Sequence, residues 1–324
     1  MENSTPLNII VVGASAGGFA AVSKLLSSIN GDLNAAMFLV VHISRNSDAE
    51  IICKMLQKHT TMHCKVAVNG EAILSKHVYI ASADHHMLLE EGRIRIQKGA
   101  YENHYRPSID VLFRSAAATY GACVIGIILT GMLDDGTSGM YAIKRSGGIC
   151  MVQHPEDAEF PNMPYSVINN MEVDHQLSIT EMGPQLTNLL MNRSCVKGEI
   201  PDEVRIEAEI TRRMSSDPED LNKLGPAADL SCPDCGGTLH RIVNDAIPRF
   251  RCFTGHVFTG TCLEDLQVTS LEESLWTAIR MMEERRNLLS SIHDSSGRKI
   301  ERAAQLGVHI SRLKSMLQTL NKDG

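Results

Sequence analysis

Residue types that together perform acyl transfer stand at the ends of three apolar segments. Ser15 lies in the glycine-flanked stretch GASAGG, directly after the run NIIVV. His42 follows a second run, AAMFLVV, and the pair Asp134 and Asp135 follows a third, CVIGIIL. A serine hydroxyl becomes a nucleophile when a neutral imidazole removes its proton and a carboxylate orients that imidazole. The sequence therefore predicts a nucleophile at Ser15 and a base at His42, with one aspartate as the orienting acid and the other as a helix cap.

Each of these residues also has a structural interpretation. Ser15 is suited to cap the helix that the recurring apolar residues after it predict, and His42 is suited to an ordinary place in a core. A glycine-rich turn between strand and helix is also typical of phosphate and dinucleotide sites. However, the glycine spacing is not G-x-G-x-x-G, and no Lys-Ser or Lys-Thr pair follows. A nucleotide site leaves His42 and the aspartates unused, so that function is disfavoured.

The apolar runs indicate the fold that must position these residues. Continuous apolar runs are typical of strands that are buried on both faces of a parallel sheet. They alternate with stretches that favour helices, at residues 48–58 and 108–120. The expected fold is α/β, with a doubly wound, mostly parallel sheet flanked by helices, and its strands present their ligands at their carboxyl ends. The order serine, histidine, aspartate differs from that of α/β-hydrolases and of two serine-protease classes, so those folds are not expected.

The composition limits the setting and the partners. The 324 residues are 43% hydrophobic, which is ample for a large core, and we expect two domains. A formal net charge of −7 argues against a surface for nucleic acid. The chain lacks both a run of ~20 apolar residues and a signal peptide, so we expect a cytoplasmic protein without membrane insertion. Its nine cysteines are expected to be reduced or metal-bound.

Further sequence blocks accompany the GAS-x-GG block at Ser15 and the histidine at the end of its strand. They are D-H-H at residues 84–86, R-P-S-x-D-x-L-F-x-S at 106–115, L-T-G-M-x-x-D-G at 129–136 and a Met-Pro pair at 163–164. With these blocks in this order, residues 7 to about 190 resemble the catalytic domain of the chemotaxis protein-glutamate methylesterases of the CheB type. The number of ordered blocks argues against a chance match.

This resemblance implies a role for each site residue. Ser15 looks like the nucleophile, His42 like the general base and Asp135 like the orienting acid. The family also implicates the backbone at Met132 near the oxyanion. Ala16 departs from the threonine that commonly follows the nucleophile, which removes one hydroxyl from the site but keeps the backbone N–H.

The resemblance also implies a reaction and its partners. The family hydrolyses γ-methyl esters of glutamate residues on the cytoplasmic helices of chemoreceptors or similar signalling proteins, and some members deamidate glutamine there. Catalysis needs no cofactor, and a methyltransferase or a regulatory protein is a further expected partner. Arg106 and Arg114 are candidates to meet the acidic face of a substrate helix. The alternative for both is a solvent-exposed or structural ion-pair residue.

A second function stays open beside the enzyme. Chemotaxis members usually carry a receiver domain ahead of the esterase, whereas here the first strand is expected to begin by residue 7. We therefore expect a stand-alone form without direct phospho-activation. The alternative function is a non-catalytic regulatory or scaffolding module that binds a partner through the carboxyl-terminal half of the chain. The intact set of Ser15, His42 and Asp135 favours the enzyme.

The second half of the chain predicts a metal site. A C-x-x-C pair and a C-x-x-x-H pair supply three thiolates and an imidazole, the ligand set of a closed structural zinc site. These residues are Cys232, Cys235, Cys252 and His256. Residues 238–243 and 249–253 are expected to form a hairpin with little core of its own, to which metal binding contributes folding free energy. Cys262 and His240 are spare candidate ligands, and a reduced C-x-x-C beside an unrelated cysteine and histidine is the alternative.

These features divide the chain into four expected regions. They are a catalytic domain at residues 1–195, a polar linker at 196–230, a zinc-ribbon-like knuckle unit at 231–265 and a helical tail at 266–324. The linker is polar and punctuated by proline and glycine, with a short helix expected at 203–214. In the tail, two amphipathic faces flank a break at Ser295, Ser296 and Gly297. They predict an antiparallel hairpin, packed on the protein's own surface, or a self-associating coiled coil.

Overall fold

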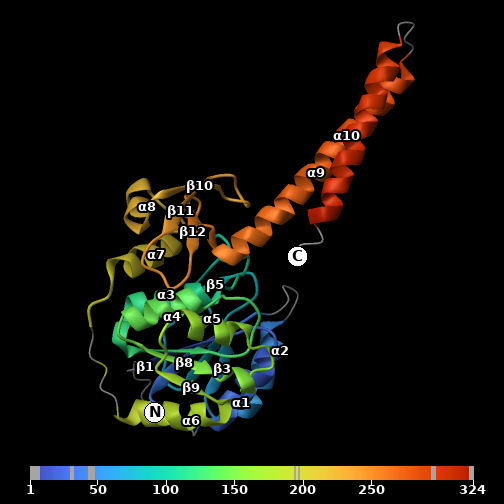
Figure 1. Ribbon diagram of the computed structural model, residues 1–324. Coiled ribbons are helices and arrows are strands. Elements are labelled where there is room, and N and C mark those ends of the chain that lie inside the picture. Colours follow the sequence, from blue (N-terminus) through green and yellow to red (C-terminus); the bar gives the residue numbers. More distant parts are fainter. Residues whose placement is uncertain are drawn as a thin grey trace. The chain divides into compact units, whose positions relative to one another are not determined.

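A computed structural model describes residues 8–29, 33–42, 48–192, 195, 198–292 and 297–320. The chain divides into two units, Met1–Gly260 and Thr261–Gly324 (Figure 1). The first unit holds the predicted catalytic domain and the cysteine-rich strands, and the second consists of the helical tail. None of the helices in these described ranges has an apolar stretch long enough to cross a membrane.

A seven-stranded sheet lies at the centre of the first unit, in the order β3-β4-β2-β1-β7-β8-β9, and every neighbouring pair is parallel. Its strands are β1 (Asn8–Ala14), β2 (Ala35–Val41), β3 (His63–Val66), β4 (His77–Ile80), β7 (Val124–Ile128), β8 (Ile149–Gln153) and β9 (His175–Leu177). β1 and β7 are buried along their whole length, which explains their uninterrupted apolar sequences. The predicted parallel α/β sheet is confirmed.

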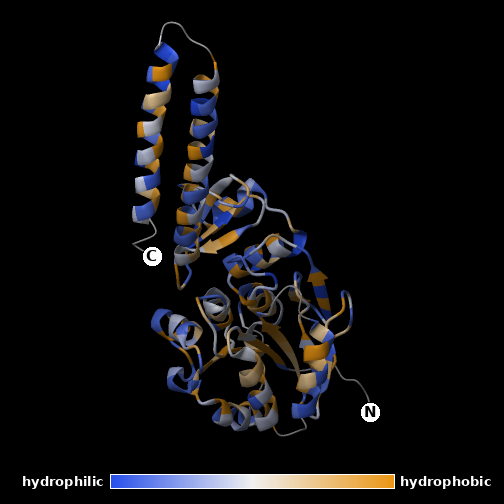
Figure 2. Ribbon diagram, turned by 90° about the vertical axis from the view of Figure 1, so that its right-hand side faces the viewer, coloured by the Kyte–Doolittle hydropathy of each residue, from blue (hydrophilic) through white to orange (hydrophobic). Residues whose placement is uncertain are grey.

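Helices cover both faces of this sheet. Successive side chains of a strand point to opposite faces, and Ile9 and Val11 accordingly belong to one apolar cluster while Ile10 and Val12 belong to another. The first cluster includes residues of α3 (Ile109–Tyr120), α4 (Thr137–Arg145) and α5 (Asn162–Asn170), and Val204 from a later helix. The second includes residues of α1 (Gly18–Ser28), α2 (Ala49–Leu56) and α6 (Ile179–Asn192). The sheet is therefore doubly wound, and its strands stand out in the hydrophobic colours of Figure 2.

The strand order creates a switch point at β1. The chain leaves β1 for β2 on one side, whereas β7 pairs with β1 on the other side. The carboxyl ends of β1, β2 and β7 consequently lie side by side at one edge of the sheet, where ligands bind in such folds. An antiparallel hairpin of β5 (His86–Glu90) and β6 (Arg93–Gln97) packs on α3. Short 3-10 turns lie at η1 (Gln57–His59), η2 (Gly121–Cys123) and η3 (Pro155–Asp157).

The stretch expected to be a polar linker is instead largely structured. It contains α7 (Asp202–Arg213), α8 (Pro218–Leu224) and β10 (Ala227–Ser231). The short helix expected here is present as α7, and α8 and β10 are further elements within the range expected to be a linker. Four apolar side chains are buried, namely Val204, Ile210, Leu221 and Leu224. One apolar residue per helical turn anchors such a helix on an existing surface even though the segment as a whole is polar.

β10 is the first strand of a four-stranded antiparallel sheet, which we call the ribbon (residues 227–259). The other strands are β11 (Thr238–Ile242), β12 (Arg249–Cys252) and β13 (Val257–Thr259), in the order β10-β11-β12-β13. β11 and β12 form the expected hairpin. The ribbon belongs to the first unit with the parallel sheet, which differs from the separate region expected at 231–265. The buried side chains of Leu239, Val257 and Phe258 provide its apolar contacts.

The second unit is a pair of helices, α9 (Gly260–Ser291) and α10 (Arg298–Leu320). Ile279, Ile310 and Leu317 are buried between them, and the Lys314 ammonium donates to the Glu283 carboxylate at 2.8 Å. The two helices match the two predicted amphipathic faces. Of the predicted break, Gly297 has a positive φ of 70°, whereas Ser295 and Ser296 lie outside the described residues.

The cysteines of the parallel-sheet region occupy two kinds of environment. Cys53, Cys64 and Cys150 are buried thiols, as expected. Cys123 and Cys195, in contrast, form a disulfide with their Cα atoms 5.1 Å apart. The expectation of reduced or metal-bound cysteines was therefore wrong for this pair. Its two residues are 72 positions apart in the sequence, and only the fold brings Cys195 next to Cys123 in η2.

Candidate active site and metal cluster

Backbone hydrogen bonds place Ser15 and His42 side by side at the carboxyl edge of the sheet. Ser15 follows β1, and its N–H donates to the carbonyl of Thr130, just beyond β7, at 3.0 Å. His42 follows β2, and its N–H donates to the carbonyl of Ala14 at 3.0 Å. The register of β1 and β2 pairs Ala14 with Val41. The next residue of each strand is the predicted nucleophile or the predicted base, so the parallel pairing alone makes them neighbours.

Asp135 is buried at the amino terminus of α3, with 1% of its surface exposed. Its Oδ2 accepts hydrogen bonds from His42 Nε2 at 3.0 Å and from the Ile109 N–H at 2.8 Å. Its Oδ1 accepts from the Ser108 hydroxyl at 3.0 Å and from the Asp110 N–H at 3.2 Å. The first N–H groups of a helix lack partners within the helix and favour an anion. The start of α3 thus provides a binding site for the Asp135 carboxylate.

These contacts determine the charge of Asp135. Burial by itself raises the pKa of a carboxyl group, but here the hydrogen bond and charge of His42, together with the backbone N–H groups of Ile109 and Asp110, outweigh burial. The pKa of Asp135 therefore lies below its usual value. At neutral pH Asp135 is ionised, as an acid that orients an imidazole and stabilises its cation must be. Burial and the charge of Asp135 raise the pKa of the neighbouring Asp110.

The ring of His42 is fixed by two contacts. Its Nε2 is bonded to Asp135, and the ring of Tyr105 stacks on it with 3.7 Å between centroids and 7° between planes. The bond to a carboxylate assigns the proton to Nε2 and a lone pair to Nδ1. Nδ1 is buried and has no hydrogen-bond partner in the described part of the chain. Nδ1 is therefore the ring nitrogen that can act as a general base.

The loop after β7 lies against the nucleophile. A Cβ added at Gly131 would come within 2.9 Å of the Ser15 Cβ and would also meet the thioether of Met163, so glycine is required there. Met132, the next residue, is half exposed. Within the described ranges, the backbone N–H groups of Ala16 and Met132 donate no hydrogen bond. Two N–H groups beside the Ser15 segment are thus left for an anionic oxygen.

The two arginines considered for substrate binding are tied into the fold. Arg114 on α3 has 2% of its side chain exposed and pairs with Glu102 and Glu207. Arg106 has 10% of its side chain exposed and donates from Nε and Nη2 to Asp84 at 3.0 and 2.6 Å. These ion pairs fit the structural alternative for buried Arg114, whereas part of the Arg106 side chain stays exposed beside Asp84.

Two residues that support the site were not assigned a role from the sequence. One is Tyr105, the ring partner of His42, and the other is His86. His86 is fully buried, accepts from the Ser108 N–H through Nδ1 and donates from Nε2 to the Ala100 carbonyl. Burial lowers the pKa of His86, which favours the neutral ring that these bonds need. Both residues lie in or beside the D-H-H and R-P-S blocks, which was the available signal.

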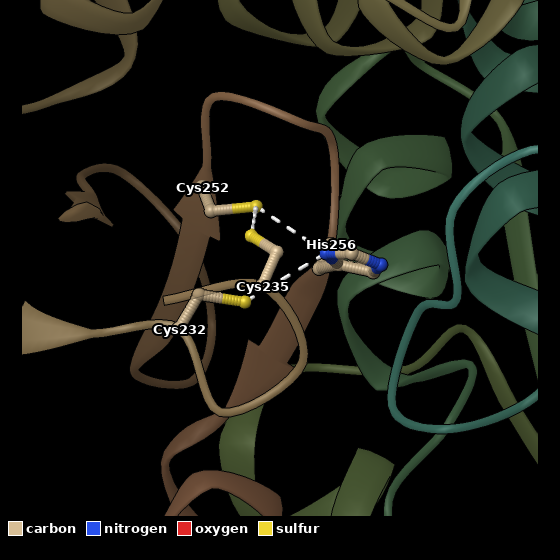
Figure 3. A group of neighbouring side chains, drawn as sticks. All are labelled: Cys232, Cys235, Cys252 and His256. Atoms are coloured by element: carbon tan, nitrogen blue, oxygen red, sulfur yellow. Dashed lines mark hydrogen bonds between the residues drawn. The ribbon is translucent and has the colours of Figure 1, made fainter. Parts of the chain in front are cut away.

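The four predicted metal ligands come together in the ribbon. Cys232 and Cys235 lie on the turn between β10 and β11, Cys252 ends β12, and His256 precedes β13. Figure 3 shows their donor atoms pointing toward one another. All four donor atoms lie within 4.8 Å of one another. The spare candidates Cys262 and His240 are not part of this cluster, and His240 instead contacts the Gly225 carbonyl.

The spacing of these donors fits a tetrahedral metal ion. Cys252 Sγ lies 3.7 Å from Cys235 Sγ and 3.5 Å from His256 Nδ1, and Cys232 Sγ lies 3.7 Å from that nitrogen. Ligand atoms about 2.3 Å from a zinc ion at the corners of a tetrahedron are about 3.8 Å apart. The other ring nitrogen, Nε2 of His256, lies 3.8 Å from the Asp234 carboxylate. A carboxylate behind a ligating histidine is typical of metal sites.

Comparison with known proteins gives a family match over the parallel sheet. The model of the family described as CheB methylesterase matches residues 10–186. A protein of Leptospira interrogans, provisionally named protein-glutamate methylesterase/protein-glutamine glutaminase, is 37% identical over 184 residues, which are 56% of this chain and 95% of that protein. Protein-glutamate methylesterase/protein-glutamine glutaminase 2 of Methanosarcina acetivorans is 32% identical over 198 residues, which are 59% of this chain and 55% of that protein.

A solved structure has the same fold. The crystal structure of the CheB methylesterase catalytic domain of Thermotoga maritima matches with a TM-score of 0.54 and 28% sequence identity, covering 57% of this chain and 99% of that one. The match to the family model ends at residue 186, so the ribbon and the tail lie outside the matched range.

Proposed function

We propose, on the premise that this chain belongs to the CheB methylesterase family, that it hydrolyses methyl esters of glutamate side chains through Ser15, His42 and Asp135. The observation that carries the proposal is the convergence of these residues at the carboxyl ends of β1, β2 and β7. There the His42 ring is bonded to Asp135 at 3.0 Å and keeps a lone pair at Nδ1. This arrangement supplies a base and its orienting acid beside a serine.

The reaction follows from these roles. Ser15 Oγ attacks the ester carbonyl carbon while His42 takes the hydroxyl proton, and the backbone N–H groups of Ala16 and Met132 stabilise the oxyanion. Collapse of the tetrahedral intermediate expels methanol, which receives the proton from His42. Water then attacks the acyl-enzyme, gives a proton to His42 and releases the glutamate carboxylate as Ser15 is restored. The same steps applied to a glutamine amide release ammonia, which is the deamidation that the relatives' names describe.

The substrate in this proposal is a methylated helical region of a chemoreceptor or of a similar signalling protein. The names of the relatives refer to glutamate and glutamine residues of proteins, and the resemblance of the sequence blocks implies receptor helices as their carriers. Such helices lie in the cytoplasm, and the proposal places this protein there as well. A methyltransferase that adds the esters is the expected opposing enzyme.

The decisive experiment uses receptor membranes that carry labelled methyl esters. Incubation with the wild-type protein is expected to release labelled methanol, and Ser15→Ala is expected to release it on the order of 10⁴-fold more slowly. A circular dichroism spectrum and thermal unfolding check that the variant is folded. Full hydrolysis by Ser15→Ala would refute the role of Ser15, and no hydrolysis by the wild type would favour the non-catalytic scaffold.

We further propose that the cluster of Cys232, Cys235, Cys252 and His256 holds a structural zinc ion. The donor spacing of 3.5–3.7 Å supports four-coordinate binding, and a set of four protein ligands leaves no open position for chemistry at the metal. Metal analysis of the purified protein is expected to give about one zinc ion per chain. A variant with Cys235→Ser is expected to lose it.

A further inference from the structure

The segment between β6 and α3 lies between the ribbon and the candidate active site. On its ribbon side, the Val257 N–H donates to the Tyr101 carbonyl at 3.2 Å, and the Asn103 N–H donates to the Val257 carbonyl at 2.8 Å. The side-chain oxygen of Asn103 accepts from the Thr259 N–H at 2.9 Å. These bonds attach the segment to β13 as though it were a further strand of the ribbon. Any shift of β13 therefore acts directly on Asn103.

On its other side, the same segment contacts the residues around Asp135. We call His42 and Asp135, which share a hydrogen bond, the catalytic pair. The side-chain N–H of Asn103 donates to Asp110 Oδ2 at 3.4 Å. Asp110 Oδ1 in turn accepts from the Gly136 N–H at 3.0 Å and from the Gly139 N–H at 2.6 Å. Gly136 directly follows Asp135, and the Asp110 N–H itself donates to the Asp135 carboxylate. A short series of buried contacts thus joins β13, through one amide side chain, to the acid that orients the base.

The conformation of Asn103 fits a bridging role. It is 4% exposed and has a positive φ of 51°, a backbone region that is unfavourable for residues other than glycine. Asparagine tolerates this region better than most side chains. Its amide oxygen is used toward the ribbon and its amide nitrogen toward Asp110, so both ends of the side chain compensate for the conformation.

The metal cluster lies at the start of β13. His256 directly precedes Val257, and the Cys252 N–H donates to the His256 carbonyl at 3.0 Å, which closes the turn between β12 and β13. Arg251, next to Cys252, anchors β12 through buried ion pairs. Its Nη2 donates to Glu102 at 3.1 Å, and Glu102 also accepts from Arg114 on α3. All three of these charged side chains are at most 2% exposed.

We propose that the ribbon positions the catalytic pair, with Asn103 as the positioning residue, so that metal bound to the Cys232, Cys235, Cys252 and His256 cluster sets the reactivity of Ser15. The inference rests on the proposed function, because it concerns the same serine, base and acid. The metal takes no part in the chemistry. It holds the start of β13, and β13 holds Asn103. Asn103 in turn holds Asp110, whose N–H donates to the Asp135 carboxylate. Asp135 then orients the ring of His42.

The test measures the reactivity of Ser15 with an alkyl fluorophosphonate, which needs no knowledge of the natural substrate. The Ser15 oxygen forms a bond to phosphorus, fluoride leaves and His42 takes the hydroxyl proton. Mass spectrometry of the full-length protein gives the maximal labelling rate constant and the half-saturating probe concentration. Ser15→Ala is the blank. The wild type and Asn103→Gly are each measured with zinc bound and after removal of zinc by a chelator, because glycine accepts the positive φ and removes only the amide.

Zinc removal is expected to lower the maximal rate constant of the wild type by roughly tenfold to a hundredfold, since small misplacements of reacting groups have effects of this size. The half-saturating concentration is expected to stay unchanged because the probe's own contacts remain. Zinc-loaded Asn103→Gly is expected to show a similar loss, and removing its zinc is expected to change the rate less than about twofold. Such non-additivity is the signature of two changes that act through one connection.

Two controls separate this role from a general effect on folding. Arg241→Ala alters an exposed side chain on β11 of the same ribbon and is expected to behave like the wild type in both states. Zinc content and thermal unfolding show whether Asn103→Gly keeps its metal and its fold. If the zinc-free wild type is partly unfolded, the zinc-loaded variant decides: an unchanged labelling rate in a folded, zinc-loaded Asn103→Gly would overturn the proposal.

The remaining outcomes are distinguishable. Labelling of the wild type at Ser15 at a rate that does not depend on zinc overturns the inference and leaves the proposed function intact. Fully additive losses from zinc removal and from Asn103→Gly also overturn it, because the two changes then act separately. If zinc-loaded wild type is labelled no faster than Ser15→Ala, the proposed function fails and the inference fails with it.

Discussion

Replacing Asp135 by asparagine tests the geometry of the site directly, because the two side chains have nearly the same shape. Both carboxylate oxygens accept hydrogen bonds, Oδ2 from His42 and Ile109 and Oδ1 from Ser108 and Asp110. An amide has only one oxygen, so its NH2 group must face one of these two pairs. The better orientation turns the NH2 toward Ser108, whose hydroxyl rotates to accept. Only the Asp110 N–H then loses its partner.

The magnitudes follow from this count. One buried N–H without a partner costs about 1–3 kcal/mol of unfolding free energy, so the Asp135→Asn variant is expected to stay folded. His42 keeps its tautomer but loses a charged partner, and a charged hydrogen bond exceeds a neutral one by about 1–2 kcal/mol. That difference corresponds to a decrease in kcat of about 5- to 30-fold. In the other orientation the NH2 faces His42, the ring changes tautomer, and the decrease is on the order of 10⁴-fold.

The assay is methanol release from methylated receptor membranes, with urea unfolding as the measure of stability. Asp134→Asn is the matched control, because it makes the same chemical change at the adjacent, partly exposed position, and it is expected to keep a rate near that of the wild type. A wild-type kcat for Asp135→Asn, or equal losses in both variants, would show that the bond between Asp135 and His42 does not serve catalysis.

Three further results are expected. Glu207→Gln should lower the unfolding free energy by about 3–5 kcal/mol at pH 7, because buried Arg249 and Arg251 each lose one of their two charged partners. Burial raises the pKa of Glu207, but the neighbouring guanidinium groups outweigh burial, so the pKa of Glu207 lies below its usual value. The difference in unfolding free energy between wild type and variant, measured by urea unfolding, should therefore shrink as the pH falls below about 4.3. An equal difference at pH 7 and pH 3 contradicts this prediction. Zinc removal should make the Cys235 thiol available to an alkylating reagent. Cys64 and Cys150 should stay unmodified with and without zinc, because burial raises the pKa of each thiol to about 12. Mass spectrometry identifies the alkylated cysteines, and alkylation of Cys235 that does not depend on zinc argues against the metal site. Gly131→Ala should lower methanol release, because its Cβ meets the Ser15 Cβ at 2.9 Å, and an unchanged rate would mean that the loop yields without moving Ser15.

The sequence by itself determined the parallel sheet and the set of residues at its edge. Uninterrupted apolar runs that alternate with helical stretches indicate strands buried on both faces, and β1, β2 and β7 are such strands. Ser15 and His42 directly follow two of them, and parallel pairing carries such positions to one edge whatever their separation in sequence. The metal ligands were predictable for a similar reason, since two short motifs contain all four residues. In both cases a local pattern carries the information.

Only the tertiary structure decided how these residues are held. His42 bonds to Asp135 through Nε2, which leaves Nδ1 without a partner among the described residues. No pattern of residue types encodes which of the two ring nitrogens contacts the carboxylate. Three further features join segments that are far apart in the sequence. They are the ion pair of Arg114 with Glu207, the disulfide between Cys123 and Cys195, and the hydrogen bond from Thr259 to Asn103. Burial and pairing of polar groups depend on what the rest of the chain places around them, so they emerge only when the chain is folded.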